Sequence, residues 1–229
     1  MASFNWTQLI PAVGPENAHI ATACVAGGVL VASGFAARVA LGNGETAHMP
    51  SKSFGIRGVF EGITEFVTAI SDMVLGKENR GFVPMFSALF TFIFVNNIFG
   101  LLPGWTPATD NINTTIAMGV FMFVVYNYLG FKEHGIGYLK HFMGPMLALA
   151  PLIFVVEIIS HVVRPFSLGL RLYVNMLADH TLLGVALSML PYFVPVILMF
   201  LGLFVSFMQA FVFMMLGMIY ISMAVSHDH

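Results

Sequence analysis

The sequence predicts an all-α integral membrane protein with five transmembrane helices and one amphipathic surface helix, and three observations support this fold class. Of its 229 residues, 58% are hydrophobic and only 9% are charged, whereas soluble domains carry about 25% charged residues. Several apolar runs are long enough to cross the hydrocarbon core of a bilayer as helices. The longest apolar region carries polar residues at helical spacing. We therefore expect residues 1–229 to form a single domain embedded in the lipid bilayer.

The charge balance and the single cysteine exclude several other classes of protein. The net charge of −2 provides no basic surface for nucleic acid. The only cysteine, Cys24, cannot form an intrachain disulfide and fits no metal-ligand pattern. The first basic residue, Arg38, follows the first apolar run, so the N-terminus lacks the pattern of a signal peptide. We expect no metal and no cofactor.

The first third of the chain predicts a polar tail, one span and one surface helix. Residues 1–18 form the tail, and residues 19–41 form a span rich in small residues. Residues 57–77 differ, because apolar residues recur there at helical spacing and polar residues occupy the opposite face. That face carries Arg57, Glu61, Glu65, Thr68 and Asp72. Such a segment is expected to lie on the membrane surface rather than to cross the membrane.

Two further spans follow, over residues 82–102 and 115–131. We expect Asn96 and Asn97 to break the first of these near its end, where their amides either bond a neighbouring helix or face water. The loop 103–114 is rich in turn-forming residues and has no Lys or Arg. Asn113 or Thr114 is the expected N-terminal cap of the span 115–131.

Lysine and arginine residues set the expected orientation in the membrane. They flank the segment 42–80 and the loop 132–141, but they are absent from the N-terminal tail and from the loop 103–114. The positive-inside rule therefore places the N-terminus outside, and five crossings place the C-terminus in the cytoplasm.

Residues 145–190 form either two spans with a hairpin near Arg164 and Pro165, or one long helix. We favour one helix, because the segment lacks the Gly or Asn of a tight reversal and because its polar residues keep their phase across Pro165. About 45 residues make about 65 Å of helix, which fits a bilayer only if the helix is strongly tilted. A reversal near residues 190–195 leads to a last helix at 196–222. Together they form a long tilted helical hairpin.

A polar stripe runs along this predicted long helix. Six polar residues fall within about 40° of one line at 100° per residue, and they are Glu157, His161, Arg164, Arg171, Asn175 and Asp179. The stripe rises about 33 Å, close to the thickness of the hydrocarbon core. Ionisable residues at that depth usually mark an ion pathway.

Arg171 is the most informative residue of the stripe. An arginine keeps its charge under almost any condition, so it can hold a partner carboxylate ionised but cannot relay protons. Either its partner carboxylate comes from another chain, or it pairs internally with Asp179 or Glu157. His180 lies about 140° from the stripe and is either part of the pathway or a packing residue. Asn175 and Gln209 cannot titrate but can organise water.

Three segments bear a resemblance to a known family. Residues 165–178, Pro-Phe-Ser-Leu-Gly-Leu-Arg-Leu-Tyr-Val-Asn-Met-Leu-Ala, resemble the signature of subunit a of the F-type ATP synthase. Residues 209–213, Gln-Ala-Phe-Val-Phe, and 97–103, Asn-Ile-Phe-Gly-Leu-Leu-Pro, also resemble it, in the same order. The resemblance covers about residues 76–224 and implies five spans, one surface helix and a long tilted pair facing a rotor ring.

The resemblance also implies roles for the polar residues. Arg171 would face the proton-carrying carboxylate of each passing ring subunit, and Gln209 would face Arg171. Glu157 and Arg164 match the acidic and basic positions at the inner end. The outer half-channel would contain Asn175, Asp179 and His180. Ser206 is a further candidate of the proton pathway, and His161, like Arg164, is a supporting residue. The family implies as partners the ring, the peripheral-stalk b subunits and the rest of the F1Fo complex.

The sequence departs from the family pattern at two places. Gly202 replaces a histidine or glutamate of many members, and Asp179 followed by His180 replaces a glycine and a glutamate. We expect Asp179 with His180 to take the proton in the outer half-channel. The protonatable groups favour H⁺ over Na⁺, and a bacterial inner membrane is the expected location. The chain would have no catalytic site for ATP of its own.

Two other functions compete with this one. A haem-binding redox subunit would need paired histidines facing each other on spanning helices, yet only His161 and His180 lie deep, and both belong to one predicted helix. A self-contained secondary transporter would show internal repeats and broken helices at the midplane, and no repeat is visible.

Overall fold

Every regular element in the described part of the chain is a helix. The computed structural model describes residues 18–41, 55–102, 105–135, 150–189 and 194–225, which contain helices and turns but no strand. Five of the helices are long and apolar enough to cross a membrane, which confirms the predicted fold class. These five are α1 (Ala18–Leu41), α3 (Val83–Phe99), α4 (Ile112–His134), α6 (Ala150–Met189) and α7 (Val194–Val225).

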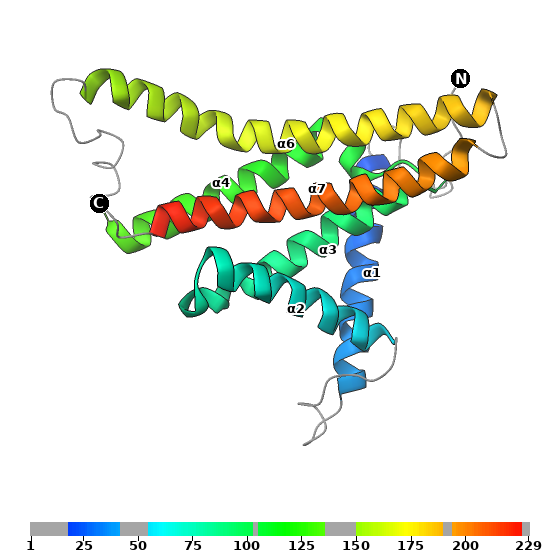
Figure 1. Ribbon diagram of the computed structural model, residues 1–229, viewed down its shortest axis with the longest axis horizontal. Coiled ribbons are helices and arrows are strands. Elements are labelled where there is room, and N and C mark those ends of the chain that lie inside the picture. The colour runs from blue at the N-terminus through cyan, green and yellow to red at the C-terminus, as the bar shows by residue number, and fades with distance from the viewer. Residues whose placement is uncertain (1–17, 42–54, 103–104, 136–149, 190–193, 226–229) are drawn as a thin grey trace.

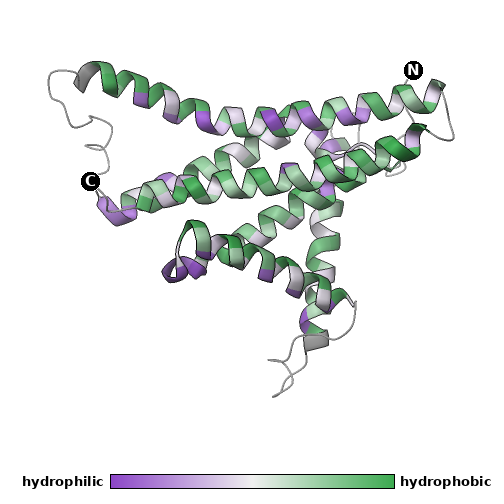
Figure 2. Ribbon diagram, viewed as in Figure 1, coloured by the Kyte–Doolittle hydropathy of each residue, from purple (hydrophilic) through white to green (hydrophobic). Residues whose placement is uncertain are grey.

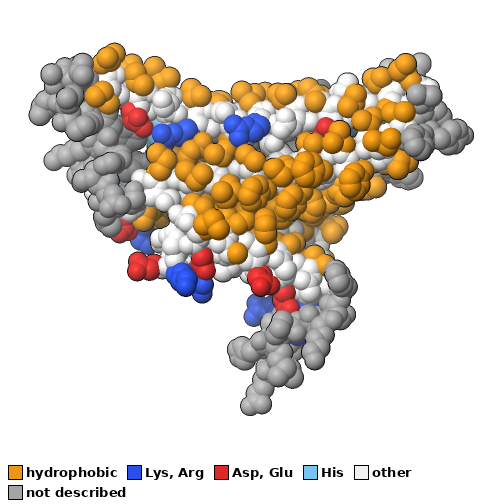
Figure 3. Space-filling model, viewed as in Figure 1, with side chains coloured by type: hydrophobic (Ala, Val, Ile, Leu, Met, Phe, Trp, Pro, Cys, Tyr) orange, Lys and Arg blue, Asp and Glu red, His pale blue; other side chains and the backbone are white. Residues whose placement is uncertain are grey.

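The sixth helix, α2 (Ile56–Val74), has the amphipathic character that the sequence predicts. Val67 and Ser71 are buried on its inner face. Its outer face is held by two ion pairs: Arg57 Nε lies 2.5 Å from Glu61 Oε1, and Arg80 donates to both oxygens of Asp72 at 2.8 and 2.5 Å. These hydrogen bonds from Arg80 lower the pKa of the half-buried Asp72 carboxyl from its ordinary value. Figure 3 shows charged side chains gathered over α2 and the following 3₁₀ turn (Lys77–Phe82), beneath a broad apolar surface.

The predicted break in the second span is wrong, because α3 continues through both asparagines to Phe99. Asn96 Nδ2 donates to Phe92 O of its own helix at 2.8 Å, and Asn97 Oδ1 accepts from Thr109 Oγ1 at 2.8 Å. Thr109 belongs to a short 3₁₀ helix, η5 (Ala108–Asp110). Asn97 therefore fastens the following loop to α3, and neither asparagine interrupts the helix.

The predicted cap of α4 is also corrected. The helix begins at Ile112, and its N-terminal cap is Asn111 rather than Asn113 or Thr114. Asn111 has extended backbone angles, and its Oδ1 accepts from Asn113 N at 2.9 Å. An asparagine in this conformation bonds the amide two residues on, which satisfies a free N–H of the first turn.

The long C-terminal region contains one helix, α6, that runs through Pro165 from Ala150 to Met189. Figure 1 shows that α6 is bowed rather than broken. Because proline has no N–H, the carbonyl four residues earlier loses its usual helical donor. That carbonyl belongs to His161, and the hydroxyl of Tyr126 on α4 donates to it at 3.5 Å. Residues 145–149 and 190 of the predicted helix lie outside the described residues.

Helices α6 and α7 lie side by side and run in opposite directions (Figure 1). Asn175 bonds Gln209, and Arg164 lies over the ring of Tyr220, so the two helices pair in antiparallel register. Their connection, 190–193, is outside the described residues, and the tilt of the pair in the membrane stays a prediction. Large apolar side chains of α3, α4, α6 and α7 fill the core between these helices, including Phe86, Met122, Leu172, Phe213 and Met218.

Glycines allow α4 and α6 to cross with their backbones nearly touching. A Cβ added to Gly169 would lie 2.8 Å from Thr115 O and 3.0 Å from Ile116 Cα, and one added to Gly119 would collide with Pro165 O. The atoms in the way are backbone atoms, which cannot move aside without shifting a helix. Small residues that admit such close approach are typical of helix crossings in membranes.

The crossing predicts a selective effect of adding side-chain volume to α6. Gly169→Leu should destabilise the fold by about 1–3 kcal/mol or more, because it forces α4 and α6 apart. Gly184→Leu on the same helix is the matched control, since a Cβ there meets nothing within 4 Å. Unfolding in bicelles followed by circular dichroism measures both. Equal effects of the two substitutions would show that the close crossing does not matter for stability.

Candidate functional site: a polar stripe on α6 and its partners

The polar stripe of α6 lies along the edge of the buried face of this helix. The buried line of α6 contains Leu168, Leu172, Met176 and Leu183. The polar stripe is turned by roughly 60° from that line on a helical wheel. Figure 2 shows the polar residues as patches along α6, whereas the adjacent α7 is almost uniformly apolar. The stripe therefore borders α7 on one side and remains open on the other.

Arg171 is exposed on the open side of the stripe. Within the described residues, no carboxylate oxygen lies within 4.0 Å of its guanidinium group. Along the helix axis, Asp179 is about 12 Å away and Glu157 about 21 Å away. Glu157 is already engaged, since its Oε1 accepts from Arg164 Nη2 at 3.4 Å. The internal pairing of Arg171 that the sequence left open is therefore not found in the structure.

A hydrogen bond between α6 and α7 lies one turn from Arg171. Asn175 Nδ2 donates to Gln209 Oε1 at 2.7 Å, and Gln209 is only 6% exposed. One turn before Gln209 on α7, the hydroxyl of Ser206 is buried without a hydrogen-bond partner among the described residues. One turn further, Gly202 is buried under the side chain of Leu101. Leu101 thus covers the α7 position at which the sequence departs from the family pattern.

His180 pairs with a residue that sequence reasoning missed. Its Nδ1 lies 3.1 Å from Oδ2 of Asp110, which belongs to η5 before α4. The other oxygen of Asp110, Oδ1, is buried without a partner within the described part of the chain. The pairing turns His180 into a bonded group of the site rather than a packing residue, while the adjacent Asp179 remains half-buried. The signal for Asp110 in the sequence was a single carboxylate in a loop that lacks Lys and Arg.

The opposite end of the stripe holds a second polar group. His161 is buried, and its Nε2 lies 2.8 Å from Asn127 Oδ1 and 3.5 Å from the hydroxyl of Tyr126, both on α4. The guanidinium of Arg164 lies over the ring of Tyr220 at 5.6 Å from its centroid, a cation–π contact. Sequence reasoning missed Tyr126 and Asn127 as partners, although they stand as adjacent polar residues in an otherwise apolar span.

The two deep histidines cannot ligate one haem, because they lie about 28 Å apart along α6. In the described ranges, no group of three or more His, Cys, Asp or Glu side chains is arranged to hold a metal ion. The fold and the site together define a multi-pass α-helical membrane protein in which polar residues follow one pair of long antiparallel helices.

Comparisons with known proteins agree with this class. A sequence model of the family described as ATP synthase A chain matches residues 20–222. The chain is 53% identical over 228 residues to ATP synthase subunit a of Bdellovibrio bacteriovorus, covering 99% of this chain and 100% of that one. It is 42% identical over 175 residues to ATP synthase subunit a of Trichlorobacter lovleyi, covering 76% of each. It is 40% identical over 191 residues to the same subunit of Citrifermentans bemidjiense, covering 83% of each.

The chain therefore belongs to the ATP synthase A chain family. This membership confirms the resemblance noted in the sequence, and it fits the five apolar helices of a multi-pass membrane protein.

The contact between Asn175 and Gln209 predicts a coupling free energy between α6 and α7. Asn175→Leu should destabilise the fold by about 0.5–2 kcal/mol, because it leaves the buried Gln209 amide unpaired. The double variant Asn175→Leu with Gln209→Leu should cost less than the sum of the two single variants. Val174→Leu, at an exposed neighbouring position, is the control. Strict additivity, measured by unfolding in bicelles, would mean that the hydrogen bond contributes nothing.

Proposed function

We propose that the chain is the stator subunit of the membrane sector of ATP synthase, in which it couples proton flow to rotation of a ring of partner subunits. The observation that carries the proposal is Arg171, an exposed arginine with no carboxylate partner in the described residues, located near the middle of a membrane-length polar stripe. A charge in this setting is costly unless a partner compensates it. A carboxylate on each passing ring subunit supplies such a partner from outside the chain.

Arg171 acts in this proposal through its permanent charge. A guanidinium beside a carboxylate favours the ionised form of that carboxylate, so a ring subunit that reaches Arg171 releases its proton. The same charge repels a proton or hydronium that would move directly along the stripe. Arg171 therefore promotes release and also separates the two sides of the pathway.

The polar groups on the two sides of Arg171 form two half-channels. The outer one contains the pair His180–Asp110, with Asp179, Asn175, Gln209 and Ser206 between that pair and Arg171. The unpartnered oxygens of Asp110 and Ser206 within the described chain provide acceptors for water in this half-channel. The inner half-channel contains Glu157, Arg164 and His161. Imidazole and carboxyl groups exchange protons near neutral pH, which supports H⁺ rather than Na⁺ as the transported ion.

The proposed function also assigns partner subunits and a cellular location to the chain. The ring faces the open side of α6 and α7, where large apolar side chains such as Phe166, Leu170, Phe200 and Phe204 are exposed. The b subunits of the peripheral stalk and the rest of the F1Fo complex complete the assembly. The N-terminus is outside and the C-terminus is in the cytoplasm of a bacterial cell, as the distribution of Lys and Arg predicts. The chain itself has no catalytic role toward ATP.

The central test replaces Arg171 by Ala in membranes that lack the native chain. Proton-driven ATP synthesis and ATP-driven proton pumping should both fall at least a hundredfold, because opposite charges at about 4 Å interact by about 4 kcal/mol at an effective dielectric constant of 20. The complex should still assemble, since no carboxylate lies within 4.0 Å of the Arg171 guanidinium group among the described residues. Lys132→Ala, which removes a positive charge at the exposed end of α4, is the control. Coupled synthesis near the native rate in Arg171→Ala would refute the stator role.

A second test concerns the outer half-channel. Asp110→Asn and His180→Gln should each slow ATP-driven proton pumping by about tenfold or more, as expected for loss of one proton-exchanging group. The double variant should be no slower than the slower single variant, because residues that act as one unit are not additive. Glu78→Gln, an exposed carboxylate beyond α2, should leave the rate unchanged. Full pumping in both single variants would exclude the pair from the pathway.

A further inference from the structure

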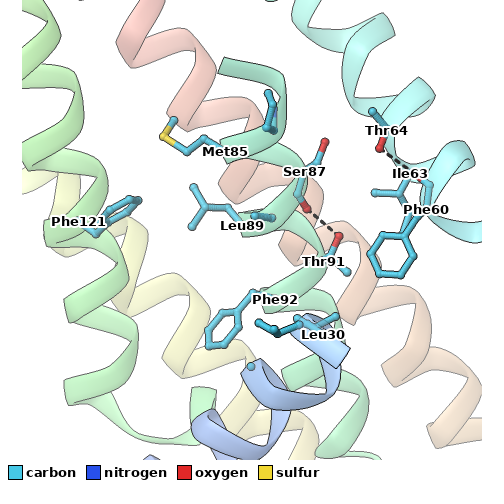
Figure 4. A pocket seen from close by; sticks show the side chains of 14 residues that line it. Leu30, Phe60, Ile63, Thr64, Met85, Ser87, Leu89, Thr91, Phe92 and Phe121 are labelled. Atoms are coloured by element: carbon cyan, nitrogen blue, oxygen red, sulfur yellow. Dashed lines mark hydrogen bonds between the residues drawn. The ribbon is translucent and has the colours of Figure 1, made fainter. Parts of the chain in front are cut away.

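Two adjoining cavities lie between α1, α2 and α3, away from the polar stripe. The first has a volume of about 640 Å³ and is lined almost entirely by apolar side chains, among them Leu30, Phe60, Ile63 and Phe92. Figure 4 shows these side chains converging on the cavity from α1, α2 and α3. The second has a volume of about 610 Å³ and is lined by charged residues of α1 and α2. Phe60 and Thr64 line both cavities, so the two adjoin each other at these side chains.

The order of lining residues along α1 follows the layers of a membrane leaflet. The charged cavity touches α1 at Gly34, Ala37 and Arg38, and the apolar cavity touches α1 at Gly27, Leu30 and Val31. From Arg38 to Gly27 the helix rises about 16 Å, which is close to half the thickness of the hydrocarbon core. The combined cavity therefore has its polar end at the depth of the headgroups and its apolar end near the middle of the bilayer.

Two of the charged side chains that line the polar cavity, one cationic and one anionic, have no ion pair among the described residues. Arg57 is paired with Glu61, and Asp72 with Arg80. Arg38 and Glu65 also line the cavity, and neither has an ion pair within 4.0 Å among the described residues. One guanidinium and one carboxylate at the same cavity complement a headgroup that carries both a phosphate and an ammonium group.

The hydroxyl groups that line the apolar cavity belong to Thr64, Ser87 and Thr91. Thr64 and Thr91 donate to carbonyls of their own helices, so their hydroxyls are already engaged (Figure 4). Ser87 Oγ, in the α3 wall, is buried and has no partner in the part of the chain that the structure describes. None of these hydroxyls is both accessible and unengaged, so the apolar cavity suits an acyl chain rather than a polar group.

We propose that this double cavity binds one phospholipid with a zwitterionic ethanolamine headgroup. Its phosphate lies at Arg38, its ammonium at Glu65, and one acyl chain fills the apolar cavity toward Gly27. A transmembrane helix fits less well, because a cylinder about 10 Å across holds only about five residues in this apolar volume. The site lies apart from the proton pathway, and it stands or falls independently of the proposed function.

Photo-crosslinking in the assembled complex tests the site. The probes are phosphatidylethanolamine and phosphatidylglycerol, each with a diazirine in one acyl chain, and mass spectrometry maps the adducts. Gly27→Phe fills the apolar cavity, and its Cβ meets nothing within 4 Å, so the fold should tolerate it. Gly28→Phe is the matched control, because Gly28 has the same free space but does not line the cavity. Arg38→Gln and Glu65→Gln test the headgroup contacts.

We expect the ethanolamine probe to label the cavity walls on α1 and α3, and Gly27→Phe to lower this labelling at least fivefold while Gly28→Phe does not. Arg38→Gln and Glu65→Gln should each lower it about threefold, and the glycerol probe should label more weakly than the ethanolamine probe. Equal labelling by both probes, or equal effects of Gly27→Phe and Gly28→Phe, would reduce the site to ordinary surrounding lipid and overturn the proposal. Adducts to another protein subunit in place of lipid would overturn it as well.

Discussion

Inside a bilayer, a polar group without a partner costs several kcal/mol, and this constraint explains why most ionisable and amide side chains of α6 have a partner. His161 meets Asn127, Glu157 meets Arg164, Asn175 meets Gln209, and His180 meets Asp110. The carbonyl of His161, which loses its helical donor because of Pro165, accepts a hydrogen bond from the hydroxyl of Tyr126. Arg171 and Asp179 depart from this pattern, because neither has an ion pair within 4.0 Å among the described residues. Arg171 keeps its charge under almost any condition, so the proposed function pairs it with a carboxylate from outside the chain.

The close crossing of α4 and α6 makes this compensation possible. Gly119 and Gly169 allow the two backbones to touch, which brings Tyr126 and Asn127 to one end of the stripe. The loop before α4 brings Asp110 to the other end, and its neighbour Thr109 fastens it to Asn97 of α3. A larger side chain at Gly119 or Gly169 would therefore disturb the polar contacts at both ends of the stripe. Helix packing and the partners of the polar stripe therefore depend on the same few contacts.

The sequence predicted what depends on local pattern. Apolar length gave the five spans, amphipathic spacing gave α2, and the unbroken phase of polar residues across Pro165 indicated one long helix. It could not predict the partners of His161 and His180, because those contacts join residues 34 and 70 positions apart and depend on where helices cross. The expected break at Asn96 and Asn97 failed for a similar reason. Asn96 donates to Phe92 O within the helix and Asn97 accepts from the distant Thr109, so neither side chain replaces a backbone hydrogen bond of the helix.

The most direct test of the account measures which carboxylate lies beside Arg171. Complexes are assembled with ¹⁵N-arginine only in this chain and ¹³C-carboxylates only in the ring, and dipolar coupling between the two is measured by solid-state NMR. We predict a coupling to a ring carboxylate at about 4 Å, the range at which opposite charges interact strongly, and its disappearance in Arg171→Ala. A coupling found instead when the ¹³C-carboxylates are placed in this chain, and lost both in Arg171→Ala and in Asp179→Asn, would contradict the account.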